Sequence, residues 1–213
     1  MPINPADPRR KTYIQMTKLI RDNRFGQTPA MFSNYLMVAI CWEESTFMNI
    51  PQEKGPAAGF GQMEPSAFGL INLEYDLKMN SEQQRAMILG SEAKSAEWVG
   101  RALHTLYSRR MREAKEKGKP TGDMFRFTLN AYAGNFGAYK AAWRDEAIQC
   151  WLNCERIQRN ARHVIYANEY VPNRTALVDA LWEGLPPNRR TRGGKNHPTW
   201  VELMSNVLAG IPD

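Results

Sequence analysis

The chain contains few of the residues that build disulfide frameworks or metal centres. Three cysteines and three histidines occur in 213 residues. A small, odd number of cysteines argues against a disulfide framework, and free cysteine is among the most buried residue types. Cys150 and Cys154 lie four residues apart on a predicted helix, where a bridge between them would be strained. We therefore expect buried thiols at Cys41, Cys150 and Cys154, no metal and no cofactor.

Long apolar segments are absent too. No apolar run approaches the roughly 20 residues that a membrane-spanning helix needs. The first eight residues include three prolines and lack the apolar core of a secretory signal peptide. We expect synthesis in the cytoplasm without a signal peptide, no transmembrane segment, and a flexible N-terminal segment over residues 1–10.

The composition is that of a folded protein with a basic surface. With 43% hydrophobic residues and six tryptophans, residues 1–213 can form a single domain with its own core. The formal charge of +6 favours an anionic partner, such as nucleic acid, an acidic membrane face or an anionic polymer. No zinc-finger spacing or RNA-binding aromatic signature is present, which disfavours nucleic acid. The basic loop 188–195 is either an anion-binding element or a solvated linker.

Hydrophobic periodicity predicts a mainly α fold. A first amphipathic helix ends near residues 22–26, and an apolar helix follows, with Thr28 as its N-cap and Pro29 in its first turn. Residues 49–61 are rich in glycine and proline, which predicts a loop with at most a small β-hairpin. Further helices are expected at 65–68, at 81–90, from Trp98 to Lys117, from the cap Asp123 to Gly134, and at 138–170, 175–183 and 199–210.

The apolar helix ends in two adjacent carboxylates, Glu43 and Glu44. The partial negative charge of a helix C-terminus and burial beside Trp42 and Phe47 would both raise the pKa of Glu44. A carboxylic acid that stays protonated near neutral pH can act as the general acid in glycosidic bond cleavage. Glu43 points about 100° away on the helix and is expected to be solvated or structurally paired.

Three segments resemble, in order, the motifs of soluble lytic transglycosylases and goose-type lysozymes. They are ESTF at residues 44–47, GFGQMEP at 59–65 and AYAG at 131–134, where the family has E-S-x-F, G-L-M-Q-x-x-P and A-Y-N-A-G. Gln62 follows Glu44 by 18 residues, a spacing that is common in this family. The resemblance covers about half of the chain. This sequence departs from the family pattern at Gly61, which replaces methionine, and at Ala133, which replaces asparagine.

The resemblance implies a lysozyme-like helical domain with a sugar-binding active site, in which any β-hairpin lies beside the site. It implies that Glu44 is the catalytic acid, that Ser45 orients it, and that Tyr132 packs near it. It also implies that Phe60, Gly61 and Gln62 contribute to the sugar site. A lytic transglycosylase needs Glu44 alone, which first protonates the leaving oxygen and then acts as base on the muramic C6 hydroxyl.

A hydrolytic lysozyme needs a second carboxylate about 5 to 9.5 Å from the acid. Glu53 follows Glu44 by nine residues, which resembles the spacing in some phage lysozymes, and is the best candidate. Its alternative role is an ordinary surface charge beside Lys54. Glu64 and Asp76 are weaker candidates for this second carboxylate.

By this resemblance we expect a bacteriolytic muramidase that cleaves the β-1,4 bond between N-acetylmuramic acid and N-acetylglucosamine in peptidoglycan. It would act on the cell wall or in the periplasm after release or non-classical delivery, as a phage lysis or tail protein or an antibacterial effector. An effector would also imply an immunity or inhibitor protein as partner. The alternatives are a non-catalytic glycan-binding or virion structural module, and a chitinase or chitosanase.

Overall fold

The described part of the molecule is helical, as the sequence predicts. The computed structural model describes residues 8–11, 13–118 and 120–134, together with Ile148, Trp151, Leu152 and Glu155. Within these residues there are six helices and no β-sheet. The helices are α1 (Tyr13–Asp22), α2 (Asn34–Ser45), α3 (Pro65–Tyr75), α4 (Ser81–Gly90), α5 (Glu92–Glu116) and α6 (Met124–Gly134). The helices predicted between 138 and 210, the basic loop 188–195, and Cys150 and Cys154 lie outside the described residues.

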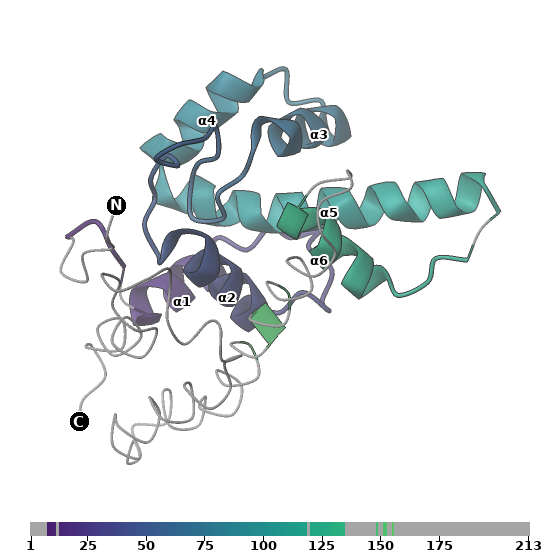
Figure 1. Ribbon diagram of the computed structural model, residues 1–213, viewed down its shortest axis with the longest axis horizontal. Coiled ribbons are helices and arrows are strands. Elements are labelled where there is room, and N and C mark those ends of the chain that lie inside the picture. Colours follow the sequence, from purple (N-terminus) through teal and green to yellow (C-terminus); the bar gives the residue numbers. More distant parts are fainter. Residues whose placement is uncertain are drawn as a thin grey trace, which may run out of the picture.

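The long helix α5 organises the fold. Figure 1 shows α3 and α4 on one side of α5 and α1 and α2 on the other, with α6 next to α5. One hydrophobic cluster joins α1, α2, α5 and α6, and receives Ala96, Val99 and Leu103 from α5. A second cluster joins α3 and α4 to Trp98 and Ala102 of α5. The spacing of these two sets places them on different faces of one helix, so α5 carries both cores.

Helix α2 begins five residues later than the Thr28–Pro29 signal predicts. Its N-cap is Ser33, whose hydroxyl accepts a hydrogen bond from the Leu36 amide at 3.1 Å. Residues 25–32 instead form turns, and the Arg24 guanidinium donates to the carbonyls of Thr28 and Pro29 at 3.2 Å each. These carbonyls are thus bound by a side chain rather than by a helix, and the prediction of the helix start was wrong.

The apolar part of α2 is buried as predicted, and the helix ends at Ser45, the residue after Glu44. Every residue from Leu36 to Trp42 is at most 3% exposed, including the free thiol of Cys41. Thr46 and Phe47 then adopt left-handed backbone conformations, with φ of 52° and 64°. The Thr46 amide closes the helix by donating to the Trp42 carbonyl at 2.8 Å. This reversal fixes where Glu44 stands at the helix end.

Most other boundaries agree with the sequence, although α5 begins at Glu92, six residues before Trp98. Asp123 caps α6 by accepting a hydrogen bond from the Arg126 amide at 2.9 Å, and α4 ends at Gly90. Helix α3 is longer than predicted, since it continues past Phe68 to Tyr75 by burying Phe68 and Ile71 against α4 and α5.

The loop before α3 contains isolated bridges rather than a hairpin of regular strands. Ala58 pairs with both Pro51 and Met63. Of the predicted flexible segment, residues 8–10 are described, and Arg10 pairs with Met48. No helix in the described part of the chain is sufficiently long and apolar to cross a membrane.

Candidate active site

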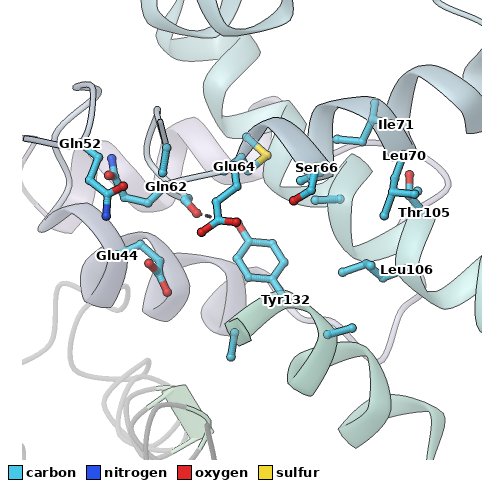
Figure 2. A pocket seen from close by; sticks show the side chains of 17 residues that line it. Glu44, Gln52, Gln62, Glu64, Ser66, Leu70, Ile71, Thr105, Leu106 and Tyr132 are labelled. Carbon is cyan, nitrogen blue, oxygen red and sulfur yellow. Dashed lines mark hydrogen bonds between the residues drawn. The ribbon is translucent and has the colours of Figure 1, made fainter. Parts of the chain in front are cut away.

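A cavity of about 270 Å³ lies where the three motifs meet. Its described lining comes from α2, the loop before α3, and helices α3, α5 and α6. Figure 2 shows polar side chains toward one end and apolar side chains toward the other, with Tyr132 between them. The lining residues are Glu44, Gln52, Ala57, Gly61, Gln62, Met63, Glu64, Ser66, Ala67, Leu70, Ile71, Ala102, Thr105, Leu106, Ala131, Tyr132 and Ala133.

Glu44 stands in the last turn of α2, half-buried and at the cavity wall. Its negative charge acts on two neighbours. Burial raises the pKa of the Cys41 thiol, and the charge of Glu44 adds to that shift. Burial likewise raises the pKa of Tyr132, and the negative charge of Glu44 adds to that shift. The carboxylate of Glu44 is therefore close enough to interact electrostatically with the phenol of Tyr132, although 88 positions separate them in the chain.

Glu43, the neighbouring carboxylate, has a different environment. Its side chain is 8% exposed and does not line the cavity. Of the two expected alternatives, solvated or structurally paired, this burial on the packed side of α2 excludes the solvated one. The two adjacent carboxylates are thus divided between the core and the cavity.

Tyr132 and Gly61 form the contact between the second and third motifs. The Tyr132 hydroxyl donates a hydrogen bond to the Gly61 carbonyl at 3.1 Å. A Cβ atom at position 61 would lie 2.2 Å from that hydroxyl oxygen and 3.0 Å from Cγ2 of Val99. Position 61 therefore has no room for the methionine of the family motif. The replacement of the family's methionine by Gly61 therefore has a steric cause in this chain.

The loop that carries Gln62 is fixed by hydrogen bonds. The side-chain Nε2 of Gln62 donates to the carbonyls of Ile50 at 3.0 Å and Gly59 at 2.9 Å. The backbone of Gln62 is left-handed, with a φ of 42°. Gly59 has a φ of 83°, and a Cβ there would lie 2.7 Å from the Ser95 hydroxyl. Ser95 in turn accepts from the Phe60 amide at 2.9 Å. Sequence reasoning missed Ser95, since a serine within a helix carries no signal for such a role.

Two residues predicted to bind substrate do not line the cavity. Ser45 is 7% exposed, and its hydroxyl donates to the Cys41 carbonyl at 2.9 Å, as is common for serine within a helix. Phe60 is fully buried in the hydrophobic cluster that includes α2. In this structure both residues support the site from behind, and their predicted contact with substrate stays a prediction.

The cavity contains a second carboxylate, which comes from Glu64. This residue is exposed and precedes Pro65 at the start of α3, where its side chain makes no capping hydrogen bond. Glu53 is exposed in the preceding turn and is absent from the described lining, as is Asp76 at the far end of α3. Of the three candidates for a second carboxylate, only Glu64 shares the cavity with Glu44.

The other end of the cavity is mostly apolar, and sequence reasoning did not identify it. Leu70 and Ile71 come from α3, Ala102 and Leu106 from α5, and Ala131 from α6. A helical apolar stripe usually marks a core face, so these residues carry no separate functional signal. Ala133, at the asparagine position of the family motif, presents only a methyl group to the cavity wall.

Within the described residues, no group of three or more histidine, cysteine, aspartate or glutamate side chains could hold a metal ion. Comparison of the chain with models of protein families, with curated proteins and with solved structures finds no match.

Proposed function

We propose that this protein cleaves the glycan strands of peptidoglycan at the β-1,4 bond between N-acetylmuramic acid and N-acetylglucosamine. The observation that carries the proposal is the shared cavity. Glu44, Gln62 and Tyr132 come from three separate segments, and all three line it. These are the residues in which the sequence resembles lytic transglycosylases and goose-type lysozymes.

Glu44 is the general acid of the proposed reaction. It donates a proton to the departing glycosidic oxygen, because the bond breaks through an oxocarbenium-like state whose leaving group needs that proton. The half-buried position at the end of α2 leaves Glu44 accessible to a strand in the cavity. Tyr132 and Gly61 form a wall beside it and hold the loop of Gln62 against α6.

Two routes complete the reaction. In the transglycosylase route, the Glu44 carboxylate takes the proton of the muramic C6 hydroxyl, which closes a 1,6-anhydro ring. In the hydrolytic route, a second carboxylate assists an attacking water or stabilises the cation. Glu64 is the carboxylate that the cavity offers for that purpose, so we assign this role to Glu64 rather than to Glu53.

The proposal is tested with Glu44→Gln, which keeps the shape of the side chain and removes its acid. Release of soluble muropeptides from purified peptidoglycan should fall by about a hundredfold or more, the usual contribution of general acid catalysis. Glu53→Gln is the matched control and should retain release. Equal release by wild type and Glu44→Gln would contradict the proposal, and retained glycan binding without any release would favour the binding module.

The products distinguish the two routes in the same experiment. An anhydro end and a reducing end differ in mass by one water, so mass spectrometry of the released fragments identifies the route. Glu64→Gln should abolish reducing ends if Glu64 assists water, and should leave anhydro ends in place. Activity on chitin or chitosan but not on peptidoglycan would favour the chitinase or chitosanase alternative.

A further inference from the structure

The polar end of the cavity is rich in hydrogen-bond acceptors. The side-chain nitrogen of Gln62 already donates to two loop carbonyls, so both of its hydrogens are used and only its carbonyl oxygen remains for a ligand. The Tyr132 hydroxyl likewise donates its hydrogen to the Gly61 carbonyl and keeps only acceptor capacity. Two residues that could have offered donors to a sugar therefore offer acceptors.

The charge of the cavity has the same bias. Glu44 and Glu64 both line it, and the described lining contains no lysine, arginine or histidine. Glu64 is exposed and makes no capping hydrogen bond to α3, so the start of that helix does not hold its carboxylate. Gln52 adds one neutral amide to this end. The charge is opposite to that of the whole chain, which has a formal net charge of +6.

We infer that the cavity selects glycan strands in which an amino sugar carries a free amino group instead of an acetamido group. This inference rests on the proposed function and names the substrate class of the same site. A protonated amine supplies three N–H donors and a positive charge, and matches the Glu64 carboxylate and the acceptor oxygens of Gln62 and Tyr132. An acetamido group supplies one neutral donor in the same place.

The same arrangement disfavours an anionic group at this end of the cavity. A stem-peptide carboxylate placed beside Glu64 would face like charge without a compensating cation in the described lining. The net positive charge of the chain can attract an anionic polymer over longer distances. At close range, the cavity then prefers the sugar of that polymer that carries a protonated amino group.

The test compares cleavage of two peptidoglycan preparations, one fully N-acetylated and one partly de-N-acetylated, at pH 6 and low salt. The wild-type protein should cleave the de-N-acetylated strands about tenfold faster, as expected for one added hydrogen bond to a charged group. In Glu64→Gln, the ratio of the rate on de-N-acetylated strands to the rate on acetylated strands should fall close to one, whatever happens to each rate. Glu116→Gln removes one charge at the exposed end of α5, outside the described lining, and should keep the ratio.

Binding provides a readout that does not depend on cleavage. In the Glu44→Gln background, calorimetry should show tighter binding of a glucosamine tetramer than of an N-acetylglucosamine tetramer. The difference should shrink with added salt, because exposed charges are screened, and should shrink further in Glu44→Gln/Glu64→Gln. Tighter binding of the N-acetylglucosamine tetramer would overturn the inference. So would a ratio of the two binding constants that Glu64→Gln leaves unchanged.

The two proposals fail in different ways. Equal rates on the two preparations, with cleavage still dependent on Glu44, would overturn the amine preference and leave the proposed function standing. Failure to cleave either preparation would overturn the proposed function, and the tetramer ratio would then decide the amine preference alone.

Discussion

At the scale of single residues, the contact between Gly61 and Tyr132 joins the second and third motifs of the proposed site. The Tyr132 ring also packs edge-on against Trp151, with 5.8 Å between the ring centroids. The backbone of Gly61 lies outside the left-handed region, so glycine is required there by space and not by φ. The position is therefore sensitive to any added side chain.

Gly61→Ala should destabilise the fold by about 1 to 3 kcal/mol, the usual effect of overpacking. The new methyl would lie 2.2 Å from the Tyr132 hydroxyl oxygen, whereas the next ring atom, Cζ, is 3.5 Å away. Removing that hydroxyl should therefore restore much of the loss.

A double-mutant cycle of Gly61→Ala with Tyr132→Phe, followed by denaturant unfolding, measures this coupling. We expect the double variant to be more stable than the sum of the single effects predicts. Simple additivity would contradict the contact.

At the scale of the elements, α3 and α5 form two walls of the cavity and are linked by a chain of polar side chains. The Tyr75 hydroxyl of α3 lies 2.5 Å from Nδ1 of His104 on α5, and Nε2 of His104 lies 3.1 Å from the Ser108 hydroxyl. Next to them, Arg112 of α5 forms a bidentate ion pair with Glu74 of α3. The histidine is thus enclosed between the two helices.

This enclosure makes the stability dependent on pH. Burial lowers the pKa of His104 below its usual value near 6.5, and Arg112 acts in the same direction while Glu74 opposes it. The unfolded chain therefore binds the proton first as pH falls, so the contribution of neutral His104 is complete above about pH 6.5 and is lost below it.

Replacing His104 by glutamine should flatten the decrease in the free energy of unfolding between pH 7 and 5. The measurement is denaturant unfolding of both proteins across this range, and the difference in slope isolates His104 from the other histidines. Parallel pH profiles for the two proteins would contradict the assignment.

The C-terminus of α3 offers a second prediction at this scale. Asp76 caps the helix with a φ of 48°, a conformation that glycine adopts without a steric penalty. Its ion pair with Lys78 is exposed on both sides and contributes little. Asp76→Gly should therefore raise the free energy of unfolding by about 1 kcal/mol.

Asp76→Ala is the matched control, because it removes the same charge but keeps a Cβ atom, and it should give no stabilisation. Thermal unfolding compares the three proteins. Peptidoglycan cleavage should be unchanged in Asp76→Gly, since Asp76 is absent from the described cavity lining.

At the scale of the whole molecule, the cavity lies between two hydrophobic clusters that share α5. Tyr132 packs against both clusters. Ile148 and Trp151, from beyond α6, are at most 1% exposed within the first cluster. Farther along, the Glu155 carboxylate accepts from the Ser33 hydroxyl at 2.5 Å, at the N-cap of α2. The helix that carries Glu44 is therefore supported by residues more than 100 positions away.

Trp151→Ala should reduce the free energy of unfolding by about 3 to 5 kcal/mol, because it leaves a large cavity in the core. It should also reduce muropeptide release, since Tyr132 loses its edge-on partner. Trp151→Phe keeps an aromatic ring and should recover part of both effects. Unfolding and release are measured on all three proteins, and full stability in Trp151→Ala would contradict the role of Trp151.

Local patterns predicted much of the fold, and for physical reasons. The continuous apolar run before Glu44 indicated burial, Asp123 indicated a cap, and the glycine and proline content of 49–61 indicated a loop. The Thr28–Pro29 pattern predicted the start of α2 too early. A capping pattern cannot reveal that the Arg24 side chain binds the carbonyls of Thr28 and Pro29. Glu53 was preferred to Glu64 for its spacing from Glu44. Spacing along a loop cannot predict which carboxylate side chains line the same cavity.

The sequence by itself determined that the described part of the chain is mainly helical, that α2 is buried, and that a carboxylate stands in its last turn, because these features depend on nearest neighbours and helical periodicity. Only the tertiary structure decided which carboxylates share a cavity, why position 61 is glycine, and which hydrogens of Gln62 and Tyr132 are already used. Those properties depend on atoms from distant parts of the chain, which come into contact only when α5 brings the two cores together.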